Sequence, residues 1–346
     1  MKKVSVIGLF CTGRDVSDGQ SIKTRILVQE LEKSLSEDNV NRIDTYGWKR
    51  HPFKLFSKSI TAVRKSENVI FMTDEGGIKI FPWLLLGANV LFHRRLHYVV
   101  IGGWLVPFLK KHKFLAACLK KFNMIFVETR SMHAGLGELG FSNVCLMPNF
   151  KNICPVEEKQ LMMTHQEPYS FCTFSRVMKE KGIEDAVKAI ESVNNKYGRT
   201  VCTLDIYGAI DSEQNEWFEN LSATFSSAIC YRGVAPYDQS VDILKNYFAL
   251  LFPTSYIKEG IPGTIIDAYA AGLPVIASRW SGFVDMVDDG ITGIGYPWLE
   301  NERLEQIVED VVLNPQRILD MKKNCLKKVA IYMPENGIEI LLEHLS

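Results

Sequence analysis

A short stretch in the second half of the chain, residues 259–267, places two carboxylates around the start of one expected helix. Glu259 falls in the loop before that helix, and Asp267 falls one turn inside it. Carboxylates there can bind ligand hydroxyl groups, while the uncovered N–H groups of a first helical turn can bind an anion. An acidic residue near a helix start also complements the helix dipole, and this structural role explains Asp267 alone equally well.

Two apolar runs of strand length are the elements that must position this stretch. Residues 248–252 precede it and residues 274–277 follow it, so the pattern predicts a strand, a loop, a helix and a second strand. Pro262 suits the first helical turn, and Gly263 and Thr264 leave backbone N–H groups uncovered. The carboxylate-bearing face of the helix is expected to be small and polar, and the opposite face to pack on the sheet.

Two cations in the same half of the chain would complete a site for a phosphorylated ligand. Arg176 and Lys181 follow the apolar run at residues 169–174, in an expected strand-to-helix loop. A guanidinium grips a diphosphate as a fork, and an ammonium binds it as a point charge. Together with the helix start and the two carboxylates, these cations describe a site for a nucleotide-diphosphate sugar.

Length, composition and charge bound the class of protein. A chain of 346 residues suits two domains, and a content of 47% hydrophobic and 23% charged residues is typical of globular proteins. The net charge of zero conceals an asymmetry, because residues 1–160 hold 24 Lys and Arg against 14 Asp and Glu, while the remainder holds 16 against 26. We therefore expect the first half to meet an anionic surface or substrate, although chance clustering on solvated faces would give the same count.

Strand and helix patterns alternate through both halves, which predicts an α/β fold with doubly wound parallel sheets. Residues 1–150 are expected to form a first domain, 151–168 a linker, 169–330 a second domain and 331–346 a terminal helix. No GxGxxG fingerprint follows the first strand at residues 8–13, which argues against a dinucleotide cofactor there. The expected strands are residues 4–9, 42–45, 68–72, 97–101, 124–127, 144–147, 169–174, 201–207, 228–231, 248–252 and 274–277.

Glycines in the first half mark two further candidate sites. Gly102 and Gly103 follow an expected strand, where paired glycines let a ligand approach the backbone on the acceptor side or simply turn the chain. Gly19, in the loop at residues 18–21, either turns the chain into the next helix or holds a phosphate.

The cysteines, the histidines and the apolar runs indicate the cellular compartment of the protein and whether it binds a metal or crosses a membrane. The eight cysteines are scattered without CxxC spacing, so we expect reduced core residues in a cytosolic protein, and the seven histidines predict no metal site. Lys2 and Lys3 lead directly into the first strand, so no secretory leader is expected. The apolar run at residues 80–92 is too short to span a bilayer. Residues 107–122 form an expected basic helix that either lies on an anionic membrane or covers the sheet.

With these residues in place, the second half resembles the retaining glycosyltransferases of the GT-B fold known as group 1 or family 4. The resemblance lies in residues 176–182, 206–208, 231–233, 252–254 and chiefly 259–297. It covers nearly the whole second domain, whereas the first domain matches only in layout. It implies two Rossmann-like domains facing across a cleft, with C-terminal helices that pack back toward the first domain.

The resemblance also implies roles for single residues. Arg176 and Lys181 would neutralise the donor diphosphate and the departing charge, and Glu259 would lie beside the donor sugar, which makes these three the expected catalytic residues. Asp267 stands where the second acid of the E-x7-E pattern contacts ribose, and here it replaces the usual Glu. The other implied donor-binding residues are Gly19, Gly208, Gly233, Gly260, Ile261, Pro262, Gly263 and Thr264.

The implied activity is transfer of a sugar from a nucleotide-diphosphate sugar to a glycan or polyprenyl-diphosphate-linked acceptor, with retention, in capsular, exopolysaccharide or lipopolysaccharide synthesis. The resemblance implies no cofactor, no required metal, no nucleic-acid partner and a cytoplasmic location at the inner face of the membrane. Two alternatives stay open: a sugar-nucleotide 2-epimerase of the same fold, and a non-catalytic sugar-nucleotide-binding subunit. The intact Arg176, Lys181 and Glu259 speak against the subunit, while the aspartate at position 267 keeps it open. The absent leader and unpaired cysteines disfavour a periplasmic binding protein.

Overall fold

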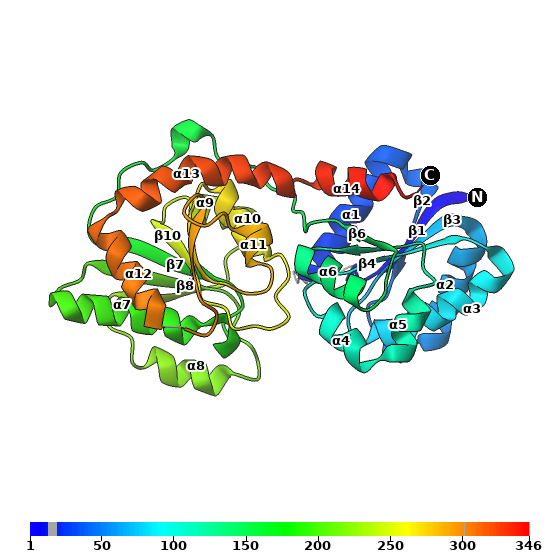
Figure 1. The fold of residues 1–346 in the computed structure, drawn as a ribbon, viewed down its shortest axis with the longest axis horizontal. Helices are drawn as coiled ribbons and strands as arrows, with labels where there is room; N and C mark the ends of the chain where they lie inside the picture. The colour runs from blue at the N-terminus through cyan, green and yellow to red at the C-terminus, as the bar shows by residue number, and fades with distance from the viewer. Residues whose placement is uncertain (13–18, 301, 346) are drawn as a thin grey trace. The chain divides into compact units, whose positions relative to one another are not determined.

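The computed structural model describes residues 1–12, 19–300 and 302–345. The chain divides into two compact units, the first made of Met1–Asn152 with Tyr332–Ser346 and the second of Ile153–Ile331 (Figure 1). Within the described residues, each unit holds one six-stranded sheet whose strand pairs are all parallel. The predicted α/β architecture of doubly wound parallel sheets is therefore confirmed.

In the first unit the strands lie in the order β2-β1-β3-β4-β5-β6. Their side chains are largely apolar on both faces, as in Val4, Val6 and Ile7 of the interior strand β1, because helices cover both sides of the sheet. The strands are β1 (Lys2–Gly8), β2 (Val40–Asp44), β3 (Ser66–Met72), β4 (Arg95–Val99), β5 (Met124–Val127) and β6 (Val144–Leu146).

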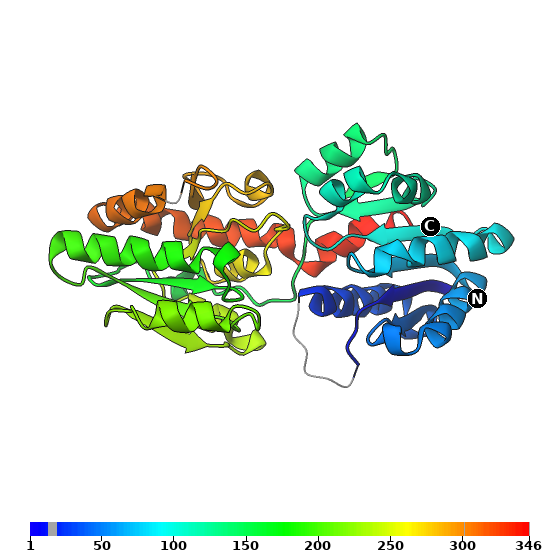
Figure 2. The same cartoon turned by 90° about the horizontal axis from the view of Figure 1, so that it is seen from below.

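Helices lie on both faces of this sheet (Figure 2). Two apolar clusters, one on each face, hold them to it. Ile338 and Leu341 of the C-terminal helix join the same cluster as Leu27 and Leu31, so α14 covers the sheet face that α1 covers. One face carries α1 (Gly19–Leu35) and α14 (Pro334–Leu342), and the other carries α2 (Pro52–Lys65), α3 (Phe81–Phe92), α4 (Leu105–Lys111), α5 (Lys113–Leu119) and α6 (Arg130–Glu138).

The second unit repeats this plan with the strand order β12-β11-β10-β7-β8-β9. Its strands are β7 (Tyr169–Phe174), β8 (Cys202–Tyr207), β9 (Ile229–Gly233), β10 (Ala249–Phe252), β11 (Val275–Ser278) and β12 (Gly293–Tyr296). Its helices are α7 (Ile183–Tyr197), α8 (Asn215–Ser222), α9 (Ser240–Leu244), α10 (Gly263–Ala270), α11 (Phe283–Met286), α12 (Glu302–Leu313) and α13 (Gln316–Val329).

Three elements differ from the prediction. The strand β12 was not expected from the sequence. The basic stretch at residues 107–122 is not one helix, since α4 ends at Lys111 and α5 begins at Lys113, with His112 between them. The carboxylate-bearing face of α10 is not a small polar surface, because α10 contacts α9 and α13 and its residues 265–270 are all buried.

The eight cysteines are all free thiols. Cys11, Cys118, Cys172, Cys202 and Cys325 are buried, as expected for core residues. Cys154 departs from that expectation, because it is exposed in the segment that follows the first unit.

Candidate active site

The second sheet reverses its winding between β7 and β10, and the predicted site residues gather at this point. From β7 the strands β8 and β9 follow toward one edge of the sheet. The next strand, β10, lies on the other side of β7, and β11 and β12 follow toward the opposite edge. Ligands of open α/β sheets bind outside the carboxyl ends of the strands at such a switch point. The loops that leave β7 and β10, residues 175–182 and 253–262, carry Arg176, Lys181 and Glu259.

Lys181 and Glu259 form an ion pair at this switch point. The Lys181 Nζ donates to Glu259 Oε2, and the two side chains are only 13% and 10% exposed. Thr254 Oγ1 donates a second hydrogen bond to the same carboxylate oxygen at 3.2 Å. The ammonium also lies over the rings of Tyr256 and Phe252, 5.2 and 5.6 Å from their centroids. A cation and a carboxylate 78 positions apart in sequence are thus held side by side.

Close packing of the loops after β7 and β10 holds Lys181 and Glu259 next to each other. Gly182 follows Lys181 with a φ of +71°, and a Cβ there would lie 2.1 Å from the carbonyl oxygen of Pro253. The Ser255 N–H donates to the Glu180 carbonyl at 2.8 Å, which ties the loop after β10 to the loop after β7. Only a glycine at position 182 lets the two loops approach this closely.

The start of α10 is tied to both neighbouring strands. Thr264 Oγ1 donates to the carbonyl of Phe174 at the end of β7. The indole N–H of Trp280 donates to the Gly260 carbonyl at 3.1 Å. Gly260, Ile261 and Pro262 are buried, while Gly263 and Thr264 are partly exposed, and a Cβ built on Gly263 meets nothing within 4 Å. The helix start therefore offers open space at Gly263 on a fixed backbone.

Arg176 and Asp267 lie apart from the central pair. Arg176 is 61% exposed, and its Nη1 lies 3.6 Å from Asp211 Oδ2, so it occupies the rim of the switch point. Asp267 is 2% exposed inside α10. The structure thus joins Lys181 with Glu259, whereas the second predicted cation and the second predicted carboxylate have other surroundings.

Gly208 and Gly233 connect the loops after β8 and β9 to the same edge of the sheet. The Gly208 N–H donates to the Gly233 carbonyl at 2.9 Å. Gly208 has a φ of +141°, and a Cβ there would lie 1.8 Å from the Ser175 carbonyl oxygen. Tyr231 OH donates to the Gly208 carbonyl at 2.8 Å. Gly208 therefore lets the loop after β7 approach closely, and Gly233 accepts the hydrogen bond that ties Gly208 to the end of β9.

A tyrosine and carboxylate cluster beside these glycines was missed from the sequence. Tyr247 OH donates to Asp205 Oδ2 at 2.6 Å and lies 2.9 Å from Tyr207 OH, while Arg232 Nε donates to Asp205 Oδ1 at 2.9 Å. Burial, followed by the hydrogen bond to Asp205, raises the pKa of Tyr247. Tyr207, Tyr247 and Asn246 line a pocket of about 460 Å³. Asp205, an ionisable residue inside the mostly apolar strand β8, was the available signal.

In the first unit, the carboxyl ends of β1, β2 and β3 surround a pocket of about 290 Å³. Thr45, Trp48, Thr73 and Asp74 are among its lining residues. The predicted acceptor-side glycines are not, because Gly102 and Gly103 follow β4. Gly19 is exposed at the start of α1, and position 18 and the end of the turn at 8–13 lie outside the described residues.

Neither a metal-binding cluster nor a membrane-spanning helix occurs in the described part of the chain. Among residues 1–12, 19–300 and 302–345, no group of three or more His, Cys, Asp and Glu is placed to hold a metal ion. None of the helices in that part of the chain combines the length and the apolar character needed to cross a bilayer.

The two sheets and their winding define the GT-B fold. The chain is similar to HepE of Anabaena, solved with UDP and glucose, with a TM-score of 0.75 and 12% identity over 99% of this chain and 98% of that one. It is also similar to sucrose-phosphate synthase from Thermosynechococcus elongatus, with a TM-score of 0.76 and 16% identity over 99% and 98% of the two chains. At these identities the likeness shows the fold alone.

Residues 168–313, which lie within the second unit, match the family described as "Glycosyl transferases group 1". An uncharacterized glycosyltransferase of Methanocaldococcus jannaschii is 23% identical over 140 residues, which are 40% of this chain and 34% of that protein. The amylovoran biosynthesis glycosyltransferase AmsK of Erwinia amylovora is 22% identical over 151 residues, 42% of this chain and 36% of the relative. The chain thus matches little more than a third of either relative.

Proposed function

We propose that the chain is a retaining glycosyltransferase that moves a sugar from a nucleotide-diphosphate sugar to a glycan or lipid-linked acceptor. The observation that carries the proposal is the Lys181–Glu259 pair, which lies at the switch point of the sheet within the residues that match the group 1 family. A cation for a departing diphosphate and a carboxylate for a sugar hydroxyl are thus neighbours. The flanking start of α10 adds backbone N–H groups that favour negative charge.

In the proposed reaction, Lys181 and the rim residue Arg176 neutralise the charge that develops on the leaving diphosphate. Such preorganised electrostatic stabilisation is commonly the largest contribution of a protein to a group transfer. Glu259 orients the donor sugar. The departing diphosphate oxygen accepts the proton of the acceptor hydroxyl on the same face of the sugar, so the new bond keeps the anomeric configuration. Asp267, which is 2% exposed inside α10, contacts the ribose in this proposal.

We propose further that the reaction needs no metal ion. Lys181, Arg176 and the start of α10 supply positive charge where a metal would otherwise bridge the phosphates. Turnover that survives a chelating agent supports this part of the proposal, and turnover restored only by added Mg²⁺ or Mn²⁺ contradicts it.

UDP-sugars are the first donors to test, because the HepE structure holds UDP and glucose. The relative AmsK is named for amylovoran biosynthesis, which favours a role in surface polysaccharide assembly. We place the reaction at the inner face of the cell membrane, where a polyprenyl-diphosphate-linked acceptor is presented.

The test begins with thermal unfolding of the wild type and of Arg176→Ala in the presence of UDP, GDP, dTDP, ADP or CMP and their common sugar conjugates. A ligand at 100 times its Kd stabilises the folded state by about 2.7 kcal/mol, which such an assay detects easily. We expect one nucleotide class to stabilise the wild type and to stabilise the variant less. If none of these ligands stabilises the wild type, the proposed donor site is wrong.

The second stage incubates the matching nucleotide sugar with lipid-linked and free glycan acceptors. Release of the free nucleotide together with an α-linked product from an α-linked donor supports the proposal. Interconversion of the donor without any acceptor indicates an epimerase, and tight binding without turnover indicates a non-catalytic subunit.

A further inference from the structure

The charge of the first unit is concentrated in one long segment. Residues 76–127, which include α3, α4 and α5, contain eight Lys and Arg and neither Asp nor Glu. Five of the lysines fall at positions 110–121, around the break between α4 and α5. A surface of this composition attracts anions without local compensation by acidic side chains.

Two neighbouring hollows mark this surface. The first, of about 500 Å³, is lined by Lys79, Trp83, Lys110, Lys111, Lys113 and Phe114 among others. The second, of about 640 Å³, is lined mainly by apolar groups of α3 and α5 and also contains Trp83 and Phe114. The two aromatic side chains therefore border both hollows. We use the name α3–α5 surface for six of the residues that line the first hollow, namely Lys79, Trp83, Lys110, Lys111, Lys113 and Phe114.

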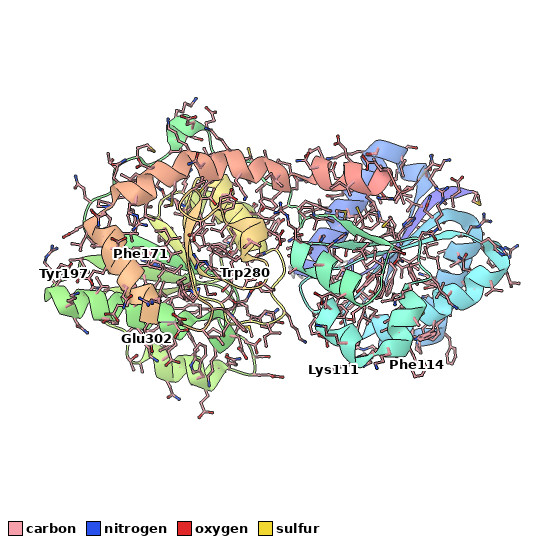
Figure 3. The ribbon with its side chains drawn as sticks, viewed as in Figure 1. Lys111, Phe114, Phe171, Tyr197, Trp280 and Glu302 are labelled. Carbon is pink, nitrogen blue, oxygen red and sulfur yellow. The ribbon has the colours of Figure 1, made fainter. Side chains whose placement is uncertain are left out.

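The aromatic residues of the α3–α5 surface are more exposed than a sheet-covering helix requires. Phe114 is 86% exposed and Trp83 is 49% exposed, and Val90 and Leu91 at the end of α3 are exposed as well. Lys111 and Phe114 lie on the same outer side of the first unit (Figure 3). Large apolar side chains gathered in one patch and rimmed by charge mark an interaction site.

The break between the two helices explains the exposure of Phe114. The ring of His112 stacks on Phe108 at 4.1 Å, and its Nδ1 donates to the Phe108 carbonyl at 2.8 Å, so the chain ends α4 and restarts as α5. In α5, Leu115 and Leu119 turn toward the core. These leucines form the core-facing side of α5, and Phe114 is not part of that side.

We propose that the α3–α5 surface docks the protein on a bilayer that contains anionic phospholipids. Trp83 and Phe114 insert at the level of the headgroups, and the lysines pair with headgroup phosphates. Aromatic rings at the interface combined with a cluster of lysines are the composition that binds such membranes. The absence of acidic residues from positions 76–127 supplies the charge complementarity that selects anionic lipid over a neutral surface. This inference rests on the membrane location proposed above and names the surface that makes the contact; its test measures lipid binding without sugar transfer, so the two proposals can fail separately.

The test is sedimentation of the full chain with vesicles of phosphatidylcholine alone or of phosphatidylcholine and phosphatidylglycerol in equal amounts. We expect binding to the anionic vesicles that weakens as ionic strength rises, and little binding to the neutral ones. Lys110→Gln with Lys113→Gln should lower the partition coefficient roughly 30-fold, since each lysine near an anionic surface contributes about 1 kcal/mol. Phe114→Ser should lower it about 10-fold or more, because the ring no longer leaves water.

Matched controls lie in the second unit. Lys188→Gln with Lys327→Gln removes the same charge, and Trp298→Ala removes an exposed tryptophan to be compared with Trp83→Ala. These controls should partition like the wild type. The proposal is overturned if the α3–α5 variants bind as tightly as the controls. It is also overturned if the wild type sediments with neither vesicle, which would leave the surface to a protein partner.

Discussion

At the scale of single residues, the charges of Lys181 and Glu259 neutralise one another in a largely buried position. Each side chain is about one-tenth exposed, so the loss of one leaves the charge of the other poorly solvated. A nucleotide diphosphate that binds here must share Lys181 with Glu259 or draw it away. The pair therefore links donor binding to the position of the sugar-binding carboxylate.

For this reason we expect Lys181→Ala to lower kcat by about 100-fold or more, as removal of one preorganised charge does. Glu259→Gln should impair transfer while leaving the Kd of the free nucleotide nearly unchanged. Steady-state kinetics and nucleotide titrations measure both effects. The control Lys188→Ala removes an exposed lysine that pairs with Glu184 on α7, and it should leave kcat unchanged. An unaltered kcat in Lys181→Ala would remove this residue from the mechanism.

Gly182 and Gly198 provide a second comparison at this scale. Both have a positive φ at the two ends of α7, but a Cβ at Gly182 would meet the Pro253 carbonyl at 2.1 Å, whereas a Cβ at Gly198 meets nothing within 4 Å. Gly198→Ala should cost about 1 kcal/mol of unfolding free energy, for the left-handed backbone alone. Gly182→Ala should cost about 3 kcal/mol or more and should also weaken nucleotide binding. Urea unfolding measures the difference, and equal losses would contradict the loop packing described above.

At the scale of elements, the sequence predicted most strands because their apolar runs are bounded by polar turns. It missed β12 because this strand has four residues, two of them glycines, which suggest a turn. In the structure, Gly293 is required for a different reason: a Cβ there would lie 2.3 Å from the Val275 carbonyl oxygen of the neighbouring strand. Only the three-dimensional pairing of strands reveals that requirement.

The sequence proposed residue types for the candidate site but could not predict how they pair. Arg176, Lys181 and Glu259 were singled out because polar residues after apolar runs stand out. That Lys181 meets Glu259 depends on β7 lying beside β10, which the order of elements along the chain does not determine. The packing of α10, which carries Asp267, also involves α13, a helix about fifty residues further along that no local pattern could bring against α10.

The strand β4 carries a titratable group whose burial makes the first unit sensitive to acid. Burial, with smaller effects from the charges of His344 and Arg95, lowers the pKa of His97 to about 4. Because this pKa lies below the ordinary value of 6.5, the unfolded chain binds the proton first. His97 therefore costs no stability above pH about 6.5, and its cost grows as the pH falls toward 4, to a total of about 3 kcal/mol.

We expect His97→Gln, which keeps a hydrogen-bonding group beside Asn68, to flatten the pH dependence of unfolding between these two values. The comparison is made from urea midpoints of both proteins across that range. His165 in the second unit also has a pKa lowered to about 4 by burial, and its contribution stays in both proteins. Parallel pH profiles would show that His97 does not control the acid response.

At the scale of the whole molecule, the first unit depends on a helix that follows the second unit in sequence. Leu341 of α14 is fully buried with Leu27 and Leu31 of α1. Leu341→Ala should therefore cost about 2–5 kcal/mol and should raise amide hydrogen exchange in α1. The control Leu313→Ala truncates an exposed leucine at the end of α12 and should change stability by less than about 0.5 kcal/mol. Unchanged exchange in α1 after Leu341→Ala would show that α14 is dispensable for that face.

This discontinuity has a consequence for biosynthesis. Domains generally fold in the order in which they leave the ribosome, the N-terminal one first. Here the strands β1 to β6 emerge early, but α14 is synthesised only after the whole of Ile153–Ile331. Until then, the apolar side chains of α1 and β3 that α14 covers are open to water and to chaperones. The second unit, whose segment is continuous, can complete its fold on the ribosome before the first, so the N-terminal unit matures last.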